Sequence, residues 1–398
     1  MSEKVMSPQG FRFAALAGGL KKSGKPDLGL IVSDVPARCA GVFTRNKVVA
    51  APVLVTAPKI RQGQCQAVLV NSGNANACTG EAGLQDAQAC AGQVAEQLGI
   101  AEELVAVSST GVIGVPLPME TFTKQIPLLT NALGHADGAD VAKAMMTTDS
   151  FPKTSARTVT LAGQECRLLG LAKGAGMIHP DMATMLAFVV TDACVAPAFL
   201  DQALRTAVDK SFNRITVDRD TSTNDMVLVL ANGMAGNDEI VAGQKESVQF
   251  VEALREILLD LAKMIVRDGE GATKLVRIQV AGAASDAEAL LAARSVATSA
   301  LVKTAFFGED ANWGRIIAAV GYSGAEVDPN RVRICFDEVA MVEAGLGLGA
   351  AQEELATKIL QKPEFTVRID LKLGDGSADY YTSDLTYDYV KINAAYRT

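Results

Sequence analysis

The sequence of 398 residues is poor in histidine, the side chain that most often acts as a general base and is the commonest metal ligand. It contains only two histidines, His135 and His179. Its seven cysteines are scattered without C-x-x-C spacing, and an odd number without a regular framework indicates reduced thiols. A cysteine nucleophile is possible in principle, but no cysteine lies within a recognisable motif.

Long apolar runs are also missing. No stretch reaches the roughly 18 uninterrupted apolar residues of a membrane span. Residues 11–20 are apolar, but this run is short, contains Arg12 and lacks the usual flanks of a signal peptide. The formal net charge of −8 argues against a broad surface for nucleic acid, although a local pocket can still bind a small charged substrate. We expect a globular, cytoplasmic protein without a membrane or nucleic-acid partner.

One segment, residues 171–194, combines a glycine-rich turn, a polar loop and an apolar run. The turn is KGAG at 173–176, and the loop contains HPD at 179–181. The run at 185–190 is dense in apolar and β-branched residues, which is typical of a buried strand. Thr184 directly precedes this strand. A nucleophile in that position is held by the strand, while the loop before it can move.

The chemistry of Thr184 depends on a nearby base, because a threonine hydroxyl is a poor nucleophile near neutral pH. If the bond between Ala183 and Thr184 is cut, the new α-amine can be that base, since its pKa is about 8. This is the N-terminal-threonine variant of the catalytic triad, and it requires no histidine. From the residues alone, a structural threonine at the start of a strand is the more common alternative.

Five further segments form a distinctive set with KGAGMIHPDMATML. They are NSGNAN at 71–76, STGVIG at 109–114, TTD at 147–149, DRDTSTND at 218–225 and INAAYRT at 392–398. In content and order they resemble segments of the glutamate N-acetyltransferase/ornithine acetyltransferase family of arginine biosynthesis. The resemblance covers essentially the whole chain.

The resemblance implies an α/β fold, namely an α/β/β/α sandwich of the self-processing threonine-nucleophile type. It also implies self-cleavage into an alpha chain, 1–183, and a beta chain, 184–398, which pair and assemble as an α2β2 heterotetramer. The alternation of strand-like and helical segments is compatible with this fold but does not establish its topology.

The resemblance further implies the reaction. Family members transfer acetyl from N-acetylornithine to glutamate through an acetyl-threonine, in a ping-pong cycle that needs no cofactor and no metal. Acetyl-CoA is possible as a co-substrate. One alternative is an N-terminal-nucleophile amidohydrolase or aminopeptidase of the same fold, in which water accepts the acyl group. Another is a non-catalytic nucleotide- or metal-binding protein built on the Gly- and Asp-rich loops.

For the site, the resemblance implies cleavage between Ala183 and Thr184, with Thr184 as nucleophile, and an oxyanion hole formed by Thr110 and Gly111. The residues alone are compatible with such a hole, because a strand that ends in Ser-Thr-Gly exposes backbone N–H groups beside a hydroxyl. The substrate contacts that the resemblance implies are Thr147, Lys173, Thr184, Glu270, Asn393 and Thr398.

Some of these residues also have a structural interpretation. The TTD segment at 147–149 follows a predicted helix and can cap it, and Glu270 lies just beyond a predicted helix end, where it can be surface charge. The acidic residues of 218–225 do not have EF-hand spacing, because the central Gly and the terminal Glu are missing. We interpret that segment as a turn-rich structural loop near the site.

Hydrophobic periodicity predicts the remaining elements. The predicted helices are 84–98, 122–133, 139–146, 197–211, 249–267 and 286–304, with a kink or break at Pro127 and a cap at Ser285. The predicted strands are 28–32, 48–56, 66–70, 105–107, 185–190, 215–217, 331–337 and 365–373.

Overall fold

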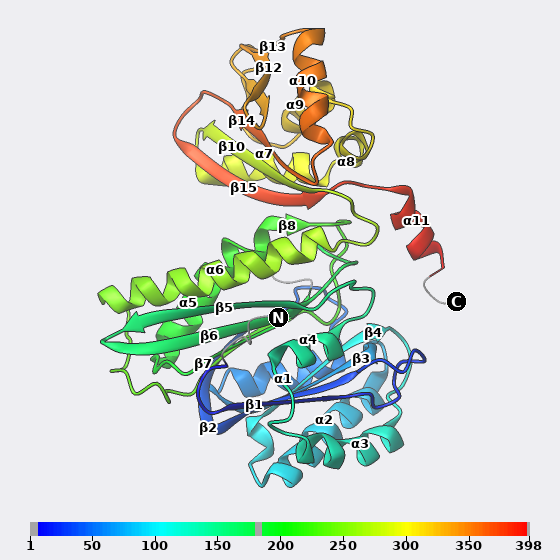
Figure 1. The fold of residues 1–398 in the computed structure, drawn as a ribbon, viewed down its shortest axis with the longest axis vertical. Helices are drawn as coiled ribbons and strands as arrows, with labels where there is room; N and C mark the ends of the chain where they lie inside the picture. Colours follow the sequence, from blue (N-terminus) through cyan, green and yellow to red (C-terminus); the bar gives the residue numbers. More distant parts are fainter. Residues whose placement is uncertain (1–6, 180–184, 396–398) are drawn as a thin grey trace. The chain divides into compact units, whose positions relative to one another are not determined.

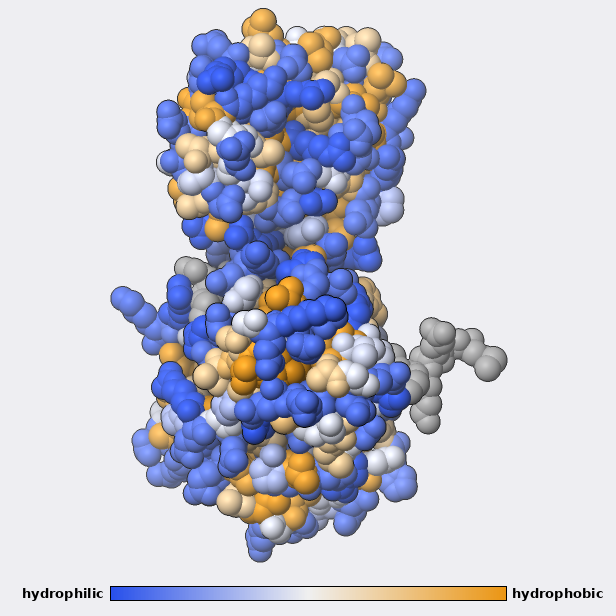
Figure 2. Space-filling view, turned by 90° about the vertical axis from the view of Figure 1, so that its left-hand side faces the viewer, coloured by the Kyte–Doolittle hydropathy of each residue, from blue (hydrophilic) through white to orange (hydrophobic). Residues whose placement is uncertain are grey.

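The computed structural model describes residues 7–179 and 185–395, and these divide into two compact units. The first unit contains the described residues up to Asn213 together with Asp220–Ile265. The second contains Arg214–Arg219 and the described residues from Val266 onward. On the face drawn in Figure 2, hydrophilic residues predominate and hydrophobic ones form small separate patches.

A sheet that comprises eight strands within the described residues forms the centre of the first unit (Figure 1). The strands are β1 (Phe11–Leu16), β2 (Leu28–Phe43), β3 (Gln64–Asn74), β4 (Val105–Val112), β5 (Lys153–Leu161), β6 (Gln164–Lys173), β7 (Leu186–Thr191) and β9 (Met226–Ala231). They lie in the order β4-β3-β2-β9-β7-β6-β5, and β1 also pairs with β2. The β3–β4 and β7–β9 pairs are parallel.

The long strand β2 folds this sheet into two layers. Its first half pairs with β1 and β3, its register shifts between Val32 and Ala37, and its second half pairs with β9. One apolar core joins Phe13 and Val68 of the first layer to Phe188 of the second. The two layers therefore face each other across that core, and the first unit is a β/β sandwich.

Helices cover both outer faces of the sandwich. The helices of this unit are α1 (Ala51–Ile60), α2 (Gly80–Leu98), α3 (Met119–Asn131), α4 (Gly138–Met145), α5 (Pro197–Asp209) and α6 (Lys245–Arg267), with short 3-10 turns at Glu102–Leu104 and Phe212–Arg214. Of these, α4 buries its apolar side chains in the core between the two layers. A second apolar core joins α1, α2 and α3 to β2, β3 and β4. On the other side, α6 packs on β6 beside Gly170. The predicted α/β/β/α arrangement is present within this unit.

The second unit has a sheet of seven strands within the described residues, in the order β13-β12-β11-β14-β10-β15-β8. They are β8 (Ile215–Thr216), β10 (Leu275–Ala283), β11 (Arg333–Phe336), β12 (Val339–Glu343), β13 (Leu346–Gly347), β14 (Glu364–Asp370) and β15 (Gly376–Ser383). The helices are α7 (Asp286–Thr298), α8 (Ala300–Phe307), α9 (Trp313–Gly321), α10 (Ala350–Leu360) and α11 (Tyr387–Ala394). Trp313 packs against the core of this unit.

Within the described residues, no single helix is long and apolar enough to cross a membrane. The bent pair α7 and α8 meets that test by length and composition only, and both helices contribute buried side chains to the core of the second unit.

Most predicted elements are confirmed with small shifts of their ends, but two element predictions were wrong. Residues 48–56 do not form a strand, because α1 begins at Ala51, with a proline at its N-terminus. At Pro127 the helix does not break, since α3 continues through it with Ile126 and Leu129 buried. The predicted helix 286–304 is two helices.

The break between α7 and α8 lies at Ser299, whose hydroxyl accepts from the N–H of Val302 and so caps a new helix. The cap predicted at Ser285 is confirmed, because its side chain accepts from the N–H of Glu288.

Two Gly→Ala substitutions should have opposite effects on stability, because Gly170 lies in the tight contact between α6 and β6 and Gly92 does not. A Cβ at Gly170 would lie 2.4 Å from a side-chain atom of Ile257, so Gly170→Ala should destabilise the protein by about 1–3 kcal/mol. Gly92 lies inside α2, and a Cβ there would meet only a side-chain atom of Glu102 at 3.7 Å. Gly92→Ala should therefore stabilise by roughly 0.5–1 kcal/mol. Urea unfolding of both variants measures the difference, and equal effects would contradict this packing.

Candidate active site

The predicted oxyanion-hole residues lie at the end of the parallel pair β3–β4, opposite Ser72 and Gly73. β4 continues through Thr110 and Gly111 instead of ending in a turn before them. Gly111 has φ of +133°, and a Cβ there would lie 2.4 Å from the carbonyl carbon of Gly73. Glycine is therefore required at 111, because the two backbones approach closely.

Lys173, the last residue of β6, reaches the same end of β4 with its side chain. Its Nζ donates to Oγ1 of Thr110 at 3.4 Å, and the residue is only 8% exposed. β4 and β6 are not neighbours in the sheet. They come together because the sheet is folded into two layers, so the sandwich creates the contact.

Asp149 holds the surroundings of Lys173 together. Its Oδ1 accepts from Nζ of Lys153 and from the N–H of Gly174, both at 2.7 Å, and its Oδ2 accepts from the N–H of Thr147 at 2.9 Å. The side chains of Asp149 and Lys153 are completely buried. Burial alone would raise the pKa of Asp149, but the ammonium groups of Lys173 and Lys153 hold that pKa well below its usual range.

A second aspartate of this site, Asp225, has a pKa that is shifted in the opposite direction. It directly precedes β9 and is 1% exposed, and its Oδ2 has no hydrogen-bond partner among the described residues. Burial raises the pKa of Asp225 well above its ordinary value, although the nearby Lys173 opposes the shift. The carboxyl group therefore favours its neutral form. Its backbone lies beside Met185, since the N–H of Met226 donates to the carbonyl of Met185.

The loop that contains Asp225 is fixed to the predicted oxyanion hole. Nδ2 of Asn224 donates to the carbonyl oxygens of Ser109 and Ala75, at 2.9 and 2.6 Å. At the loop's other end, the hydroxyl of Thr221 donates to the carbonyl of His179 at 3.1 Å. For residues 221–225, the interpretation as a structural loop near the site is confirmed.

The second unit brings together two other predicted residues, Glu270 and Asn393, which are 123 positions apart. Nδ2 of Asn393 in α11 donates to Oε2 of Glu270 at 2.8 Å. Glu270 is only 8% exposed, so it is not ordinary surface charge. Gly271 has φ of +68°, and a Cβ there would lie 2.6 Å from the N of Tyr389, so the chain beside Glu270 packs tightly on α11.

Three predicted residues, Ala183, Thr184 and Thr398, lie outside the described residues. The described chain on either side of the predicted cleavage point is well packed. Ile178 bridges to Thr221, and Met185 is buried before β7 begins. Every predicted residue of the first unit that the structure describes, namely Thr110, Gly111, Thr147 and Lys173, lies in the neighbourhood of Asp149 or of the β4 end.

Sequence reasoning missed Lys153 and Lys21 as parts of this site, and it assigned Asp225 only to a structural loop near it. Lys153 had a weak signal, an i,i+4 spacing from Asp149, but nothing showed that both would be buried. Lys21 lies beside Gly73, where its Cγ is 3.3 Å from the position of a Cβ, and it interacts electrostatically with Asp149 and Lys173. Burial lowers its pKa, and the nearby carboxylates oppose that shift.

Comparison with known proteins leads to the same family that the sequence motifs resemble. The sequence matches the ArgJ family over residues 12–398. It is 67% identical to the arginine biosynthesis bifunctional protein ArgJ of Syntrophotalea carbinolica over 396 residues, covering 99% of this chain and all of that one. Identity to the Geobacter sulfurreducens protein of the same name is 58% over 393 residues, with coverage of 99% and 100%.

A solved structure agrees. The crystal structure of the ArgJ protein from Bacillus halodurans is 44% identical, with a TM-score of 0.51, and the match covers 52% of this chain and 97% of that one. The fold and the matches define an acyltransferase of arginine biosynthesis, and the predicted fold class is confirmed. The chain belongs to the ArgJ family. The alternative of an amidohydrolase or aminopeptidase is not favoured.

Matched Asp→Asn substitutions of the two buried aspartates should change the unfolding free energy in different ways. Asp149→Asn removes the carboxylate on which the buried Lys153 ammonium depends, and should cost about 3–5 kcal/mol of unfolding free energy at pH 7. Because its folded pKa is depressed, the stabilisation by Asp149 is present above the unfolded pKa and is lost as pH falls toward the folded one.

Asp225→Asn should leave the protein at least as stable as the wild type. The folded pKa of Asp225 is raised, so its contribution falls as pH rises from the unfolded toward the folded pKa. The advantage of the Asn variant should therefore be larger at pH 8 than at pH 5. Urea unfolding at both pH values measures this, and a loss of several kcal/mol at pH 8 would show that Asp225 is ionised in the native state.

Proposed function

We propose that this chain transfers acetyl from N-acetylornithine to glutamate by a ping-pong mechanism, giving ornithine and N-acetylglutamate. The observation that carries the proposal is the contact between Lys173 and Thr110 beside Gly111, which unites a cation and an oxyanion-hole candidate at the end of the sandwich. Thr184 is the proposed nucleophile, and its α-amine, released by cleavage after Ala183, is the proposed base.

In the first half-reaction, Thr184 Oγ attacks the acetyl carbonyl and ornithine leaves. In the second, the α-amine of glutamate attacks the acetyl-threonine. Thr110 and the N–H of Gly111 stabilise the negative oxygen in both steps, and such donors typically contribute about 10²–10³ in rate. The tight backbone at Gly111 supports this role, since the N–H is held in place by the β3–β4 pair.

Lys173 is the proposed anchor for the α-carboxylate that both substrates share. Its surroundings suit an anion, because the single carboxylate of Asp149 faces two ammonium groups while burial favours the neutral form of Asp225. Thr147 is a further proposed substrate contact, and its N–H is already fixed by Asp149.

Glu270, Asn393 and Thr398 are proposed to contact the far end of the substrate. The carboxylate of Glu270 suits the side-chain ammonium of ornithine. Glutamate has a carboxylate in that place, which the amide of Asn393 and the hydroxyl of Thr398 suit better. The hydrogen bond from Asn393 to Glu270 supports a joint role for these two residues.

Self-cleavage would produce chains 1–183 and 184–398 that share one sheet, because β6 before the cut pairs with β7 after it. The solved Bacillus halodurans chain supports this proposal, since 97% of its length covers only 52% of this chain. We also propose an α2β2 heterotetramer, a cytoplasmic location and acetyl-CoA as a second donor.

Thr184→Ala should prevent processing and acetyl transfer. The variant should run as one full-length chain, while the wild type separates into two fragments under denaturing conditions, the second beginning at Thr184. Intact-mass analysis measures the chain lengths of the variant and of the wild type. The control is Thr160→Ala, at an exposed position of β5, which should be cleaved normally. A fully active, uncut wild-type chain would refute the mechanism.

Glu270→Gln should slow the acetylornithine half-reaction more than the glutamate half-reaction, because only ornithine places an ammonium there. A buried ion pair that loses one partner costs about 3–5 kcal/mol. Single-turnover acetylation of the enzyme, followed separately by deacetylation with glutamate, tests this. Equal slowing of both steps would mean that Glu270 has a structural or general catalytic role.

A further inference from the structure

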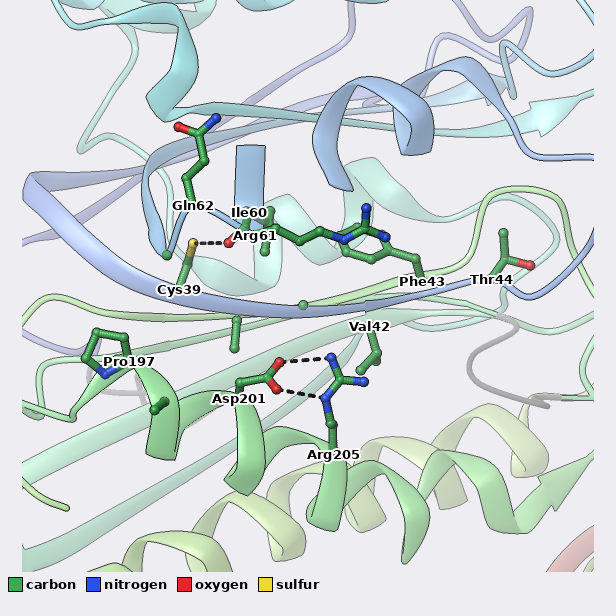
Figure 3. A pocket seen from close by; sticks show the side chains of 14 residues that line it. Cys39, Val42, Phe43, Thr44, Ile60, Arg61, Gln62, Pro197, Asp201 and Arg205 are labelled. Atoms are coloured by element: carbon green, nitrogen blue, oxygen red, sulfur yellow. Dashed lines mark hydrogen bonds and ion pairs between the residues drawn. The ribbon is translucent and has the colours of Figure 1, made fainter. Parts of the chain in front are cut away.

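A groove of about 650 Å³ lies in the first unit beside the second half of β2 (Figure 3). One side is formed by the end of α1 and the turn after it, including Arg61 and Gln62, and the other by α5, including Asp201 and Arg205. Its volume is within the range of small-molecule and cofactor sites. None of the residues predicted for the active site lines it.

The floor of the groove is an open strand edge. In the β2–β9 pair, the N–H of Thr44 donates to the carbonyl of Asp225, so alternate residues of β2 bond to β9. The intervening residues face the other way, as the bond from the N–H of Cys39 to Gly63 shows. The N–H and C=O groups of Gly41 and Phe43 therefore face the groove, without a backbone partner among the described residues.

The groove has an excess of positive charge. Arg205 is held by Asp201 through two hydrogen bonds, at 2.8 and 3.1 Å, which balances one charge. The guanidinium of Arg61 has no hydrogen bond or ion pair within the described ranges, and only its backbone N–H is bonded, to the carbonyl of Ala57. The two arginines lie on opposite sides of the β2 ribbon in Figure 3. Arginine is well suited to bind phosphate, because its planar guanidinium can donate two parallel hydrogen bonds.

One end of the groove adjoins the candidate active site. Thr44 lines the groove, and its hydroxyl donates to the carbonyl of Ser222 at 2.7 Å. Thr44 pairs with Asp225, and the neighbouring Met226 bonds to Met185, so Thr44 and Met185 lie two strands apart at one level of the sheet. Adjacent strands are about 4.8 Å apart, which places these two backbones about 10 Å from each other.

We propose that this groove binds the phosphorylated carrier of a thioester acetyl donor, coenzyme A, with its phosphates at Arg61 and Arg205 and its arm directed past Thr44. The adenine or the amides of the arm would pair with the free groups of Gly41 and Phe43. An acidic extended peptide could use the same edge, but the continuity with the acyl site favours the thioester.

The inference rests on the proposed function and deepens it. In the transfer step, Thr184 Oγ forms a bond to the acetyl carbon, the carbon–sulfur bond breaks, and the hydroxyl proton passes through the α-amine to the leaving thiolate. The later attack by glutamate is common to both donors. A defect in the groove should therefore affect only the first half-reaction with acetyl-CoA.

The test compares the two donors in the processed enzyme. Arg61→Ala should raise KM for acetyl-CoA, and Kd for coenzyme A by calorimetry, about 10-fold or more, as expected for a lost bond to a charged group. Asp201→Asn should lower both values, because it frees the charge of Arg205. In both variants, kcat/KM for acetylornithine should stay within about 2-fold of the wild type. Arg12→Ala, an exposed arginine on β1, is the control and should change neither reaction.

Three outcomes would overturn the inference. The first is a wild-type enzyme that neither binds coenzyme A nor uses acetyl-CoA, a result that leaves acetylornithine-dependent transfer as a separate test of the proposed function. The second is an equal loss of both reactions in Arg61→Ala. The third is unchanged coenzyme A binding with an altered oligomeric state in size-exclusion chromatography, which would make the groove a contact between protein copies.

Discussion

The carboxylate of Asp149 is the interaction on which the candidate site depends. It is buried, yet it stays charged because two ammonium groups and two backbone N–H groups surround it. Those contacts connect the chain after α4, the start of β5 and the end of β6. A buried anion tolerates few geometries, since each unsatisfied contact is costly in a low-dielectric interior. It therefore fixes the backbone from which Lys173 reaches Thr110.

The folded sheet explains how distant residues meet. β4 and β6 lie far apart in the strand order, but β2 passes from one layer to the other and brings their ends together. The same strand leaves an open edge in the second layer, beside the groove. One long strand thus creates both the approach of Lys173 to Thr110 and the surface proposed for a second acetyl donor.

The sequence predicted the parts of the site better than their arrangement. The motifs around Thr110, Lys173 and Glu270 identify candidate residues through the family resemblance that they carry. They contain no information on burial, so the charge states of Asp149 and Asp225 could not be predicted. These two aspartates differ only in their neighbours, and those of Asp149 include Lys153, 4 positions away, and Gly174, 25 positions away in the chain.

The secondary structure was predictable where one periodicity dominated, as in α2 and α6. It was not predictable where tertiary packing decided, as in α1, whose β-branched residues Val53, Val55 and Thr56 suggest a strand. The helix forms because a proline starts it and both of its faces are covered by other elements. The folding of one sheet into two layers has no periodic signature, so only the family resemblance anticipated it.

The central claim is that acetyl groups pass through Thr184, and the position of the acetyl group in the trapped intermediate tests it most directly. The processed enzyme is incubated with N-acetylornithine in the absence of glutamate, quenched in acid, digested and examined by peptide mass spectrometry. We expect acetylation of the peptide that begins at Thr184, and removal of that acetyl group when glutamate is added before quenching. Acetylation at a cysteine or lysine that is discharged by glutamate, with Thr184 unmodified, would contradict it.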